Sequence, residues 1–167
     1  MDNNIKNSKK ILVIDLLYMG DLIFATPFFR QLRKNFPDSK IDFIVNSNFY
    51  DLIGNNPHFN NVYAYNKNWS IKESWKFAKN LKKRNYNLGI NIHGNWRSIL
   101  LMHLIDADYN IGYGGDGKGL FLDEVIEADS KQHMVESYLK FLKKMDLKRF
   151  DDDKLEIKVD NRANKRM

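Results

Sequence analysis

Short apolar runs of strand length alternate with helical segments along most of this chain, and that alternation limits the fold more than any other feature. Residues 10–16 (KILVIDL) form a continuous apolar run broken only by Asp15, which is typical of a strand buried on both faces of a parallel sheet. Further strands are predicted over residues 41–45, 62–65, 88–92, 109–113 and 155–159. The order of elements predicts an α/β fold in which a parallel sheet carries helices on both faces.

Helical segments fill the intervals between these strands. After a turn at residues 17–21, in which Asp21 is a suitable N-cap, a helix is expected to reach about Asn35, with a kink or a fresh start capped by Thr26 at Pro27. Other helices are predicted over residues 49–53, 71–84, 96–105 and 134–145. Spacings of three and four predict Ile71, Trp75, Ala78 and Leu81 on the inner face of one helix and Val135, Leu139 and Leu142 on that of another.

The composition fits one globular domain and removes several kinds of chemistry. The chain has 167 residues, of which 43% are apolar and 29% charged. It has no cysteine, so disulfides, cysteine nucleophiles and thiolate metal sites are excluded. No metal-ligand spacing, nucleophile elbow or catalytic triad pattern occurs. A polar start and the lack of a long apolar run predict a cytoplasmic protein without a signal peptide.

Two turns that follow predicted strands carry polar side chains suited to chemistry. They are Met19-Gly20-Asp21 and His93-Gly94-Asn95. Ligands of open α/β sheets bind beyond the carboxyl ends of the strands, and the two turns face one crevice if their strands are near neighbours. An acid at a helix N-terminus has its anionic form stabilised, and histidine serves as acid, base or phosphate partner. The alternatives are that Asp21 is only a helix cap and that His93 lies in an ordinary polar turn.

A basic segment and a glycine-rich segment remain. The net charge is +6, and Lys72, Lys76, Lys79 and Lys83 lie along one predicted helix face near Trp69 and Trp75. This face suits anionic headgroups or substrate phosphates, or it is simply a solvated surface; no motif supports nucleic acid. Residues 112–119 hold five glycines and Lys118 without the spacing of a P-loop or dinucleotide fingerprint, so a flexible loop is predicted and a flavodoxin-like or nucleotide-binding domain is disfavoured.

The segment ILVIDLLYMGDLIFATPFFRQLRKNFPDSKIDFIV (residues 11–45) resembles the opening of the lipopolysaccharide heptosyltransferase family, glycosyltransferase family 9. The shared features are a strand, a turn ending in Gly20-Asp21, a helix with Thr26-Pro27, then Phe36-Pro37 and a second strand. Later segments match the family in the same order: residues 86–94 (YNLGINIHG), 111–113 (IGY) and 133–139 (HMVESYL). The resemblance covers residues from about 10 to 147.

This resemblance implies the N-terminal, acceptor-side half of a GT-B glycosyltransferase, in which two Rossmann-like domains enclose the active site. It implies inverting transfer from a nucleotide-sugar donor such as ADP-heptose to lipopolysaccharide core or a related surface glycan, without a metal or other cofactor. The family's proposed general base maps to Asp21. The lipid-linked acceptor implies contact with the inner face of the cytoplasmic membrane. The predicted acceptor-binding residues are Gly20, Met19, His93, Gly94, Asn95, Lys72, Lys76 and Lys79.

The chain departs from the family pattern in residue types and in length. The family usually has Arg or Lys in place of Asp15 and small hydroxyl residues in place of Leu17 and Tyr18, which bears on the identity of the acceptor. Residues 1–160 are expected to form the acceptor-side domain, and residues 161–167 a loose tail or the start of an interdomain linker. No donor-binding half is present, so the 167 residues alone are expected not to transfer sugar. The alternative is a non-catalytic module that binds a glycolipid or a protein on the same scaffold.

Overall fold

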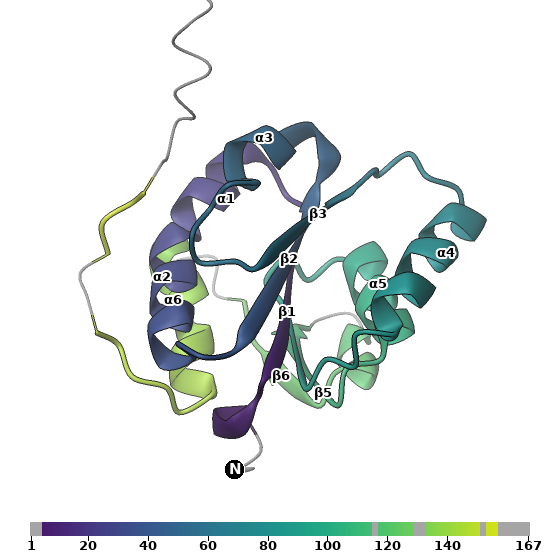
Figure 1. The fold of residues 1–167 in the computed structure, drawn as a ribbon. Coiled ribbons are helices and arrows are strands. Elements are labelled where there is room, and N and C mark those ends of the chain that lie inside the picture. The colour runs from purple at the N-terminus through teal and green to yellow at the C-terminus, as the bar shows by residue number, and fades with distance from the viewer. Residues whose placement is uncertain (1–4, 115–116, 129–132, 151–152, 157–167) are drawn as a thin grey trace, which may run out of the picture.

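A computed structural model describes residues 5–114, 117–128, 133–150 and 153–156, which fold around one parallel sheet (Figure 1). Its strand order is β3-β2-β1-β4-β5-β6, and every neighbouring pair is parallel. The strands are β1 (Lys10–Asp15), β2 (Lys40–Asn46), β3 (Asn61–Tyr65), β4 (Leu88–Asn91), β5 (Tyr109–Tyr113) and β6 (Glu124–Ile126). The predicted α/β class is therefore confirmed.

Helices cover both faces of the sheet. One face carries α1 (Met19–Phe24), α2 (Thr26–Asn35) and α6 (Met134–Lys144), and the other carries α4 (Ile71–Lys82) and α5 (Trp96–Ile105) (Figure 1). The short elements are α3 (Tyr50–Ile53) and the 3-10 turns η1 (Ile5–Asn7), η2 (Ser47–Phe49) and η3 (Lys118–Phe121). Within the described ranges, no helix has both the length and the apolar character needed to span a bilayer.

The strand order reverses direction at the centre of the sheet. From β1 the chain proceeds outward to β2 and β3, and then returns through α4 to β4 on the other side of β1. The carboxyl ends of β1 and β4 are thus neighbours at a topological switch point, where the two flanking loops diverge and leave room for a ligand.

Strand β1 shows why the sheet is stable. Ile11 and Val13 join the hydrophobic cluster under α2 and α6, while Leu12 and Ile14 join the cluster under α4 and α5. All four side chains are fully buried. Burial of each aliphatic side chain of this size contributes roughly 1.5–3 kcal/mol, so a strand covered on both faces is a major source of stability.

The helical segment after β1 breaks where the proline predicts. Ala25 is both the C-cap of α1 and the N-cap of α2, so a fresh helix starts here, although Thr26 is its first residue rather than its cap. Pro27 lies in the first turn of α2, where its missing N–H has no helical partner to lose. Thr26 Oγ1 instead donates to the Ile23 carbonyl at 2.7 Å, which ties the two helices together.

The inner face of α4 differs from the predicted one, whereas that of α6 is as predicted. Ala78 and Leu81 are buried, but Ile71 is 91% exposed and Trp75 is 49% exposed, so their inward placement was wrong. The inward face of α4 instead carries Ser74, whose hydroxyl hydrogen-bonds the Tyr65 hydroxyl at 2.8 Å, and Phe77, whose ring packs against Tyr65 and Trp69. In α6 the predicted inward residues Val135, Leu139 and Leu142 are buried.

Two predictions near the end of the chain also change. The glycine-rich segment leads into η3 and the three-residue edge strand β6, which is too short for a sequence pattern to reveal. Residues 155–156, the described part of the strand predicted over residues 155–159, are not in a strand. Here the Glu156 carboxylate accepts from Arg30 at 2.7 Å and lies 3.1 Å from His58 Nε2. Residues 115, 157–160 and the predicted tail at 161–167 lie outside the described residues.

Candidate functional site

The turns that follow β1 and β4 meet at the switch point. Backbone pairing continues as far as the Ile92 N–H, which donates to the Ile14 carbonyl at 3.1 Å. One step further, the Leu16 N–H donates to His93 Nδ1 at 3.2 Å. The imidazole thus takes the place of a backbone acceptor where the strands diverge. The two turns predicted to face one crevice are joined by this bond.

The shape of the β4–α5 turn is set by two asparagines and a glycine. Asn91 Oδ1 accepts from the N–H groups of His93 and Gly94, both at 3.1 Å. Asn95 is the N-cap of α5, and its Oδ1 accepts from the Ser98 N–H at 2.8 Å. Gly94 has φ +71°, and a Cβ there would lie 2.6 Å from Tyr113 Cβ. Gly94 and Asn95 therefore have structural roles whether or not they touch a ligand.

Asp21 lies in the first turn of α1, but it is not the cap that the sequence predicted. The cap is Tyr18, in extended conformation, and Asp21 stands three residues later, where its Oδ2 accepts from the Tyr18 N–H at 3.3 Å. An acid at this position stabilises the start of the helix, because its carboxylate accepts a hydrogen bond from the backbone N–H of the cap residue. Asp21 is only partly buried, and this one long bond leaves most of its acceptor capacity available.

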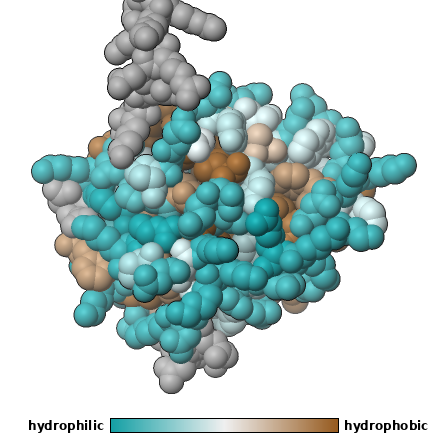
Figure 2. Space-filling model, in the orientation of Figure 1, coloured by the Kyte–Doolittle hydropathy of each residue, from teal (hydrophilic) through white to brown (hydrophobic). Residues whose placement is uncertain are grey.

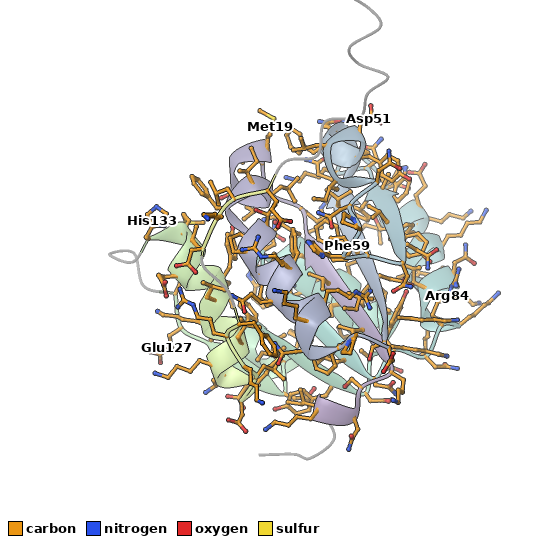
Figure 3. All side chains as sticks on the ribbon, turned by 60° about the vertical axis from the view of Figure 1, so that its left-hand side comes forward. Met19, Asp51, Phe59, Arg84, Glu127 and His133 are labelled. Carbon is orange, nitrogen blue, oxygen red and sulfur yellow. The ribbon has the colours of Figure 1, made fainter. Side chains whose placement is uncertain are left out.

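The surface beside Asp21 is open. Met19 and Gly20 are exposed, and apart from the adjoining residues and the backbone of α1 itself, no atom of the described residues lies within 4 Å of the position that a Cβ on Gly20 would occupy. Figure 3 shows Met19 and Asp51 at the same end of the molecule, where α1 and α3 begin. A ligand can therefore approach the first turn of α1 from the carboxyl end of the sheet.

His93 is held in its neutral form. Burial, together with the charge of the nearby Lys67 ammonium, lowers the pKa of its imidazole from 6.5 to about 4. Nδ1 accepts from the Leu16 N–H at 3.2 Å, and Nε2 lies 2.8 Å from Asn95 Nδ2, a contact in which donor and acceptor depend on the tautomer of the ring. Both ring nitrogens are therefore engaged by neighbouring polar groups, which fixes the orientation of the imidazole.

Asp15 is a fully buried acid at the end of β1. Its Oδ1 accepts from the Leu17 N–H at 2.8 Å, whereas Oδ2 has no hydrogen-bond partner among the described residues. Burial raises the pKa of this carboxyl to about 7; the Leu17 N–H opposes the rise, Asp21 adds to it and Lys67 opposes it. The pKa of the Tyr138 hydroxyl is also raised, mainly by burial and next by the charge of Asp15. Like Asp15 Oδ2, the Tyr138 hydroxyl oxygen has no hydrogen-bond partner among the described residues.

Lys67 is a positively charged residue close to the two turns, which sequence reasoning did not place in the site. It lies in the β3–α4 loop, with its Nζ 5.2 Å from the centre of the Tyr18 ring, and Arg97 donates to its carbonyl. Its charge acts on both Asp15 and His93. Its position two residues after β3 was the available signal, because the carboxyl ends of parallel strands share one edge of the sheet.

The other predicted lysines occupy a different surface. Lys72, Lys76 and Lys79 lie on the exposed side of α4, and Lys79 Nζ stands 4.7 Å from the centre of the Trp75 ring. In the part of the chain that the structure describes, no hydrogen bond or ion pair joins them to the turns at residues 19–21 or 93–95. The structure thus brings together Met19, Gly20, Asp21, His93, Gly94 and Asn95, and sets the three lysines apart on α4.

The strand order and the polar groups at the switch point define a Rossmann-like α/β protein, in which the predicted ligand crevice lies beyond the carboxyl ends of β1 and β4. The family model of glycosyltransferase family 9 (heptosyltransferase) matches residues 74–166, more than half of the chain. The chain belongs to this family, as its sequence pattern predicted.

Relatives and solved structures agree with this assignment. Lipopolysaccharide heptosyltransferase 3 of Escherichia coli K12 is 28% identical over 145 residues, which cover 81% of this chain and 42% of that protein. The family 9 glycosyl transferase from Veillonella parvula DSM 2008 superposes with a TM-score of 0.85 at 24% identity, over 95% of this chain and 47% of that one. E. coli heptosyltransferase WaaC, solved with ADP-2-deoxy-2-fluoro heptose, superposes with a TM-score of 0.72 at 19% identity, over 86% of this chain and 50% of that one.

These comparisons fix the fold class and the extent of the match. The likeness to the two solved structures shows that they share this fold, and the chain spans half or less of the length of the proteins it matches.

Proposed function

We propose that this chain is the acceptor-side half of an inverting glycosyltransferase. It takes part in transfer of a sugar from a nucleotide-sugar donor such as ADP-heptose to lipopolysaccharide core or a related surface glycan. The observation that carries the proposal is the carboxylate of Asp21, partly exposed in the first turn of α1 beside the β1–β4 crevice, in a chain of glycosyltransferase family 9.

Asp21 is the proposed general base. Its carboxylate takes the proton of an acceptor hydroxyl while that oxygen forms a bond to the anomeric carbon of the donor sugar. The bond from the anomeric carbon to the nucleoside diphosphate breaks, and the diphosphate leaves with the electron pair. Attack opposite to the leaving group inverts the anomeric configuration. A positioned base contributes typically about 10²–10⁴-fold to such a step.

The crevice supplies groups that suit a phosphorylated sugar acceptor. His93 and Asn95 line the β4 side, and Gly20 and Met19 form the open surface beside Asp21. Lys67 adds a positive charge near the crevice, whereas Lys72, Lys76 and Lys79 lie on the separate exposed surface of α4. The proposed transfer uses no metal ion or other cofactor, because the donor is a co-substrate whose diphosphate is bound by a second domain.

A lipid-linked acceptor places the enzyme at the inner face of the cytoplasmic membrane, so we propose a cytoplasmic protein in peripheral contact with that surface and without a nucleic acid partner. The separate domain boundaries, with residues 1–160 as the acceptor-side domain and 161–167 as linker or tail, belong to the same proposal. The 167 residues alone are then expected to give no transfer, because the donor-binding half is not among them.

The competing function is a non-catalytic module that binds a glycolipid or a protein. The hydrogen bond from the Tyr18 N–H to Asp21 favours it, because this bond alone gives the acid a structural role at the helix start.

Transfer from ADP-heptose, measured with the protein as its gene encodes it, separates the two functions. Reading the gene beyond codon 167 first establishes whether a donor-binding half follows. The enzyme proposal predicts transfer to lipopolysaccharide core acceptors by the encoded protein. If the encoded protein binds core oligosaccharide at the crevice, seen as amide shifts of Gly20, Gly94 and Asn95, yet transfers nothing, the module is correct instead.

A further inference from the structure

The surface formed by α4 and α5 has an unusual combination of exposed apolar and basic side chains. We define the α4–α5 face as the apolar residues Ile71, Trp75, Leu100 and Leu104 together with Lys72, Lys76, Lys79 and Lys83. Ile71 is 91% exposed and Trp75 49%, and on the neighbouring helix Leu100 and Leu104 are 44% and 39% exposed. Large apolar residues that cluster on a surface in this way mark an interaction site rather than the scattered exposure found on most proteins.

An apolar groove runs between the two helices. It encloses about 320 Å³ and is lined mainly by apolar and aromatic side chains, with Ile71 on one wall, Leu100 and Leu104 on the other, and Trp69 and Tyr65 below. In Figure 2, hydrophobic surface is visible on the right-hand side, where α5 lies beside α4 in Figure 1. Ser74 and Arg97 are the polar residues of its lining, and the apolar remainder is suited to hydrocarbon.

The lysines beside the groove are not neutralised. Lys72, Lys76, Lys79 and Lys83 are exposed and make no ion pair within the described residues. The acid of the same helix, Glu73, is occupied by the N–H and hydroxyl of Ser70 at the helix start, both at 2.7 Å. The face therefore attracts an anionic partner that also offers apolar surface.

We infer that the α4–α5 face binds an anionic lipid bilayer. Ile71 and Trp75 enter the boundary between headgroups and acyl chains, and the four lysines contact lipid phosphates. This combination of an apolar edge, a tryptophan and flanking lysines is the pattern of helices that lie in the membrane interface. A second copy of the chain is a poorer occupant, because a two-fold contact through this face would place the lysine rows against each other.

The inference rests on the proposed function, since it assigns a surface to the membrane contact proposed there. Both α4 and α5 begin at the carboxyl edge of the sheet, where the β1–β4 crevice lies. Ile71 is only four residues beyond Lys67, which reaches that crevice. Docking through the α4–α5 face thus brings the crevice close to the headgroup layer, where a lipid-linked acceptor presents its sugars.

Flotation of the 167-residue chain with lipid vesicles tests this directly. The chain is expected to float with vesicles that contain phosphatidylglycerol and not with phosphatidylcholine alone, and added salt is expected to weaken binding. The double variants Ile71→Ser/Trp75→Ser and Lys72→Glu/Lys76→Glu are each expected to bind about 10-fold more weakly or worse. All four positions are exposed, so circular dichroism is expected to match that of the unchanged chain.

Matched control variants lie on the rest of the surface. Phe150→Ser removes a 49% exposed aromatic ring beside α2, and Lys40→Glu/Lys143→Glu makes the same charge change as the lysine pair on α4. Both are expected to bind as the unchanged chain does. The inference is overturned if phosphatidylglycerol vesicles do not bind, if the controls lose binding equally, or if Ile71→Ser/Trp75→Ser instead dissolves a dimer seen by sedimentation without lipid. Asp21→Asn is expected to float normally, so a failure of the catalytic proposal leaves this test intact.

Discussion

The Leu16 N–H donates to His93 Nδ1 at 3.2 Å, and this bond joins the β1–α1 and β4–α5 turns at the centre of the sheet. This bond follows the last backbone hydrogen bond between β1 and β4, so the imidazole helps to hold the two strands together and also lines the crevice. A ring that accepts at Nδ1 cannot also carry a proton there, and burial lowers the pKa of the imidazole, so His93 is a neutral side chain and not a charged phosphate partner.

The stability of the fold is expected to depend on the protonation of His93. Its pKa is about 4 in the folded chain against 6.5 for an ordinary histidine. Between these values the unfolded chain takes up a proton that the folded chain does not, so stability is lost as pH falls from about 6.5 to 4. The loss from this residue is at most about 3 kcal/mol.

Urea unfolding of the chain and of His93→Gln across this pH range measures the contribution. Glutamine offers an oxygen to the Leu16 N–H but does not titrate, so its stability is expected to fall less steeply as the solution is acidified. Equal slopes for the two proteins would show that His93 is not held neutral by the fold.

Asp15 is expected to have the opposite effect. Its pKa is raised from 3.8 to about 7, so the folded chain retains a proton that the unfolded chain has released, and stability is lost as pH rises from about 4 to 7. Asp15→Asn keeps an oxygen for the Leu17 N–H and removes the buried charge. We expect it to raise the free energy of unfolding at pH 8 by about 2–4 kcal/mol and to change it little at pH 4. A variant destabilised at pH 8 would indicate that the ionised carboxylate has a partner.

The two glycines of the candidate site are expected to respond differently to alanine. Gly94→Ala forces a side chain into a left-handed backbone with its Cβ 2.6 Å from that of Tyr113, and we expect a loss of at least about 2 kcal/mol. Gly20→Ala meets open space within the first turn of α1, and we expect it to be neutral or stabilising by up to about 1 kcal/mol. Thermal unfolding of both variants measures the contrast, which would be contradicted by similar losses.

The main features of the fold were predictable from residue patterns, because burial on both faces leaves a strong signal. The fully buried strand β1 and the helix break at Pro27 were visible for this reason. The residue pattern predicted the wrong inward face where tertiary contacts decide which side of a helix packs on the sheet. In α4 the side chains of Ser74 and Phe77 contact Tyr65 while Ile71 and Trp75 are exposed, although an apolar stripe with the same spacing predicted them inside.

The candidate site was predictable in outline and not in its electrostatics. The switch-point rule placed Asp21 and His93 near one another, since it requires only that their strands be neighbours. The neutral state of His93 depends on its burial in the folded chain and on the charge of Lys67, and the reach of Lys67 depends on the path of the β3–α4 loop. Neither is encoded in a local pattern.

The most direct test of the central claim is sugar transfer by the protein as its gene encodes it, compared with its Asp21→Asn variant. Asparagine keeps an oxygen for the Tyr18 N–H, so the helix start is expected to survive while the base is lost. Asp51→Asn, a change to another acid in a first helical turn, is the control. We expect Asp21→Asn to lower kcat by about 10²–10⁴-fold with little change in the KM for acceptor. Full activity in a folded Asp21→Asn protein would contradict it.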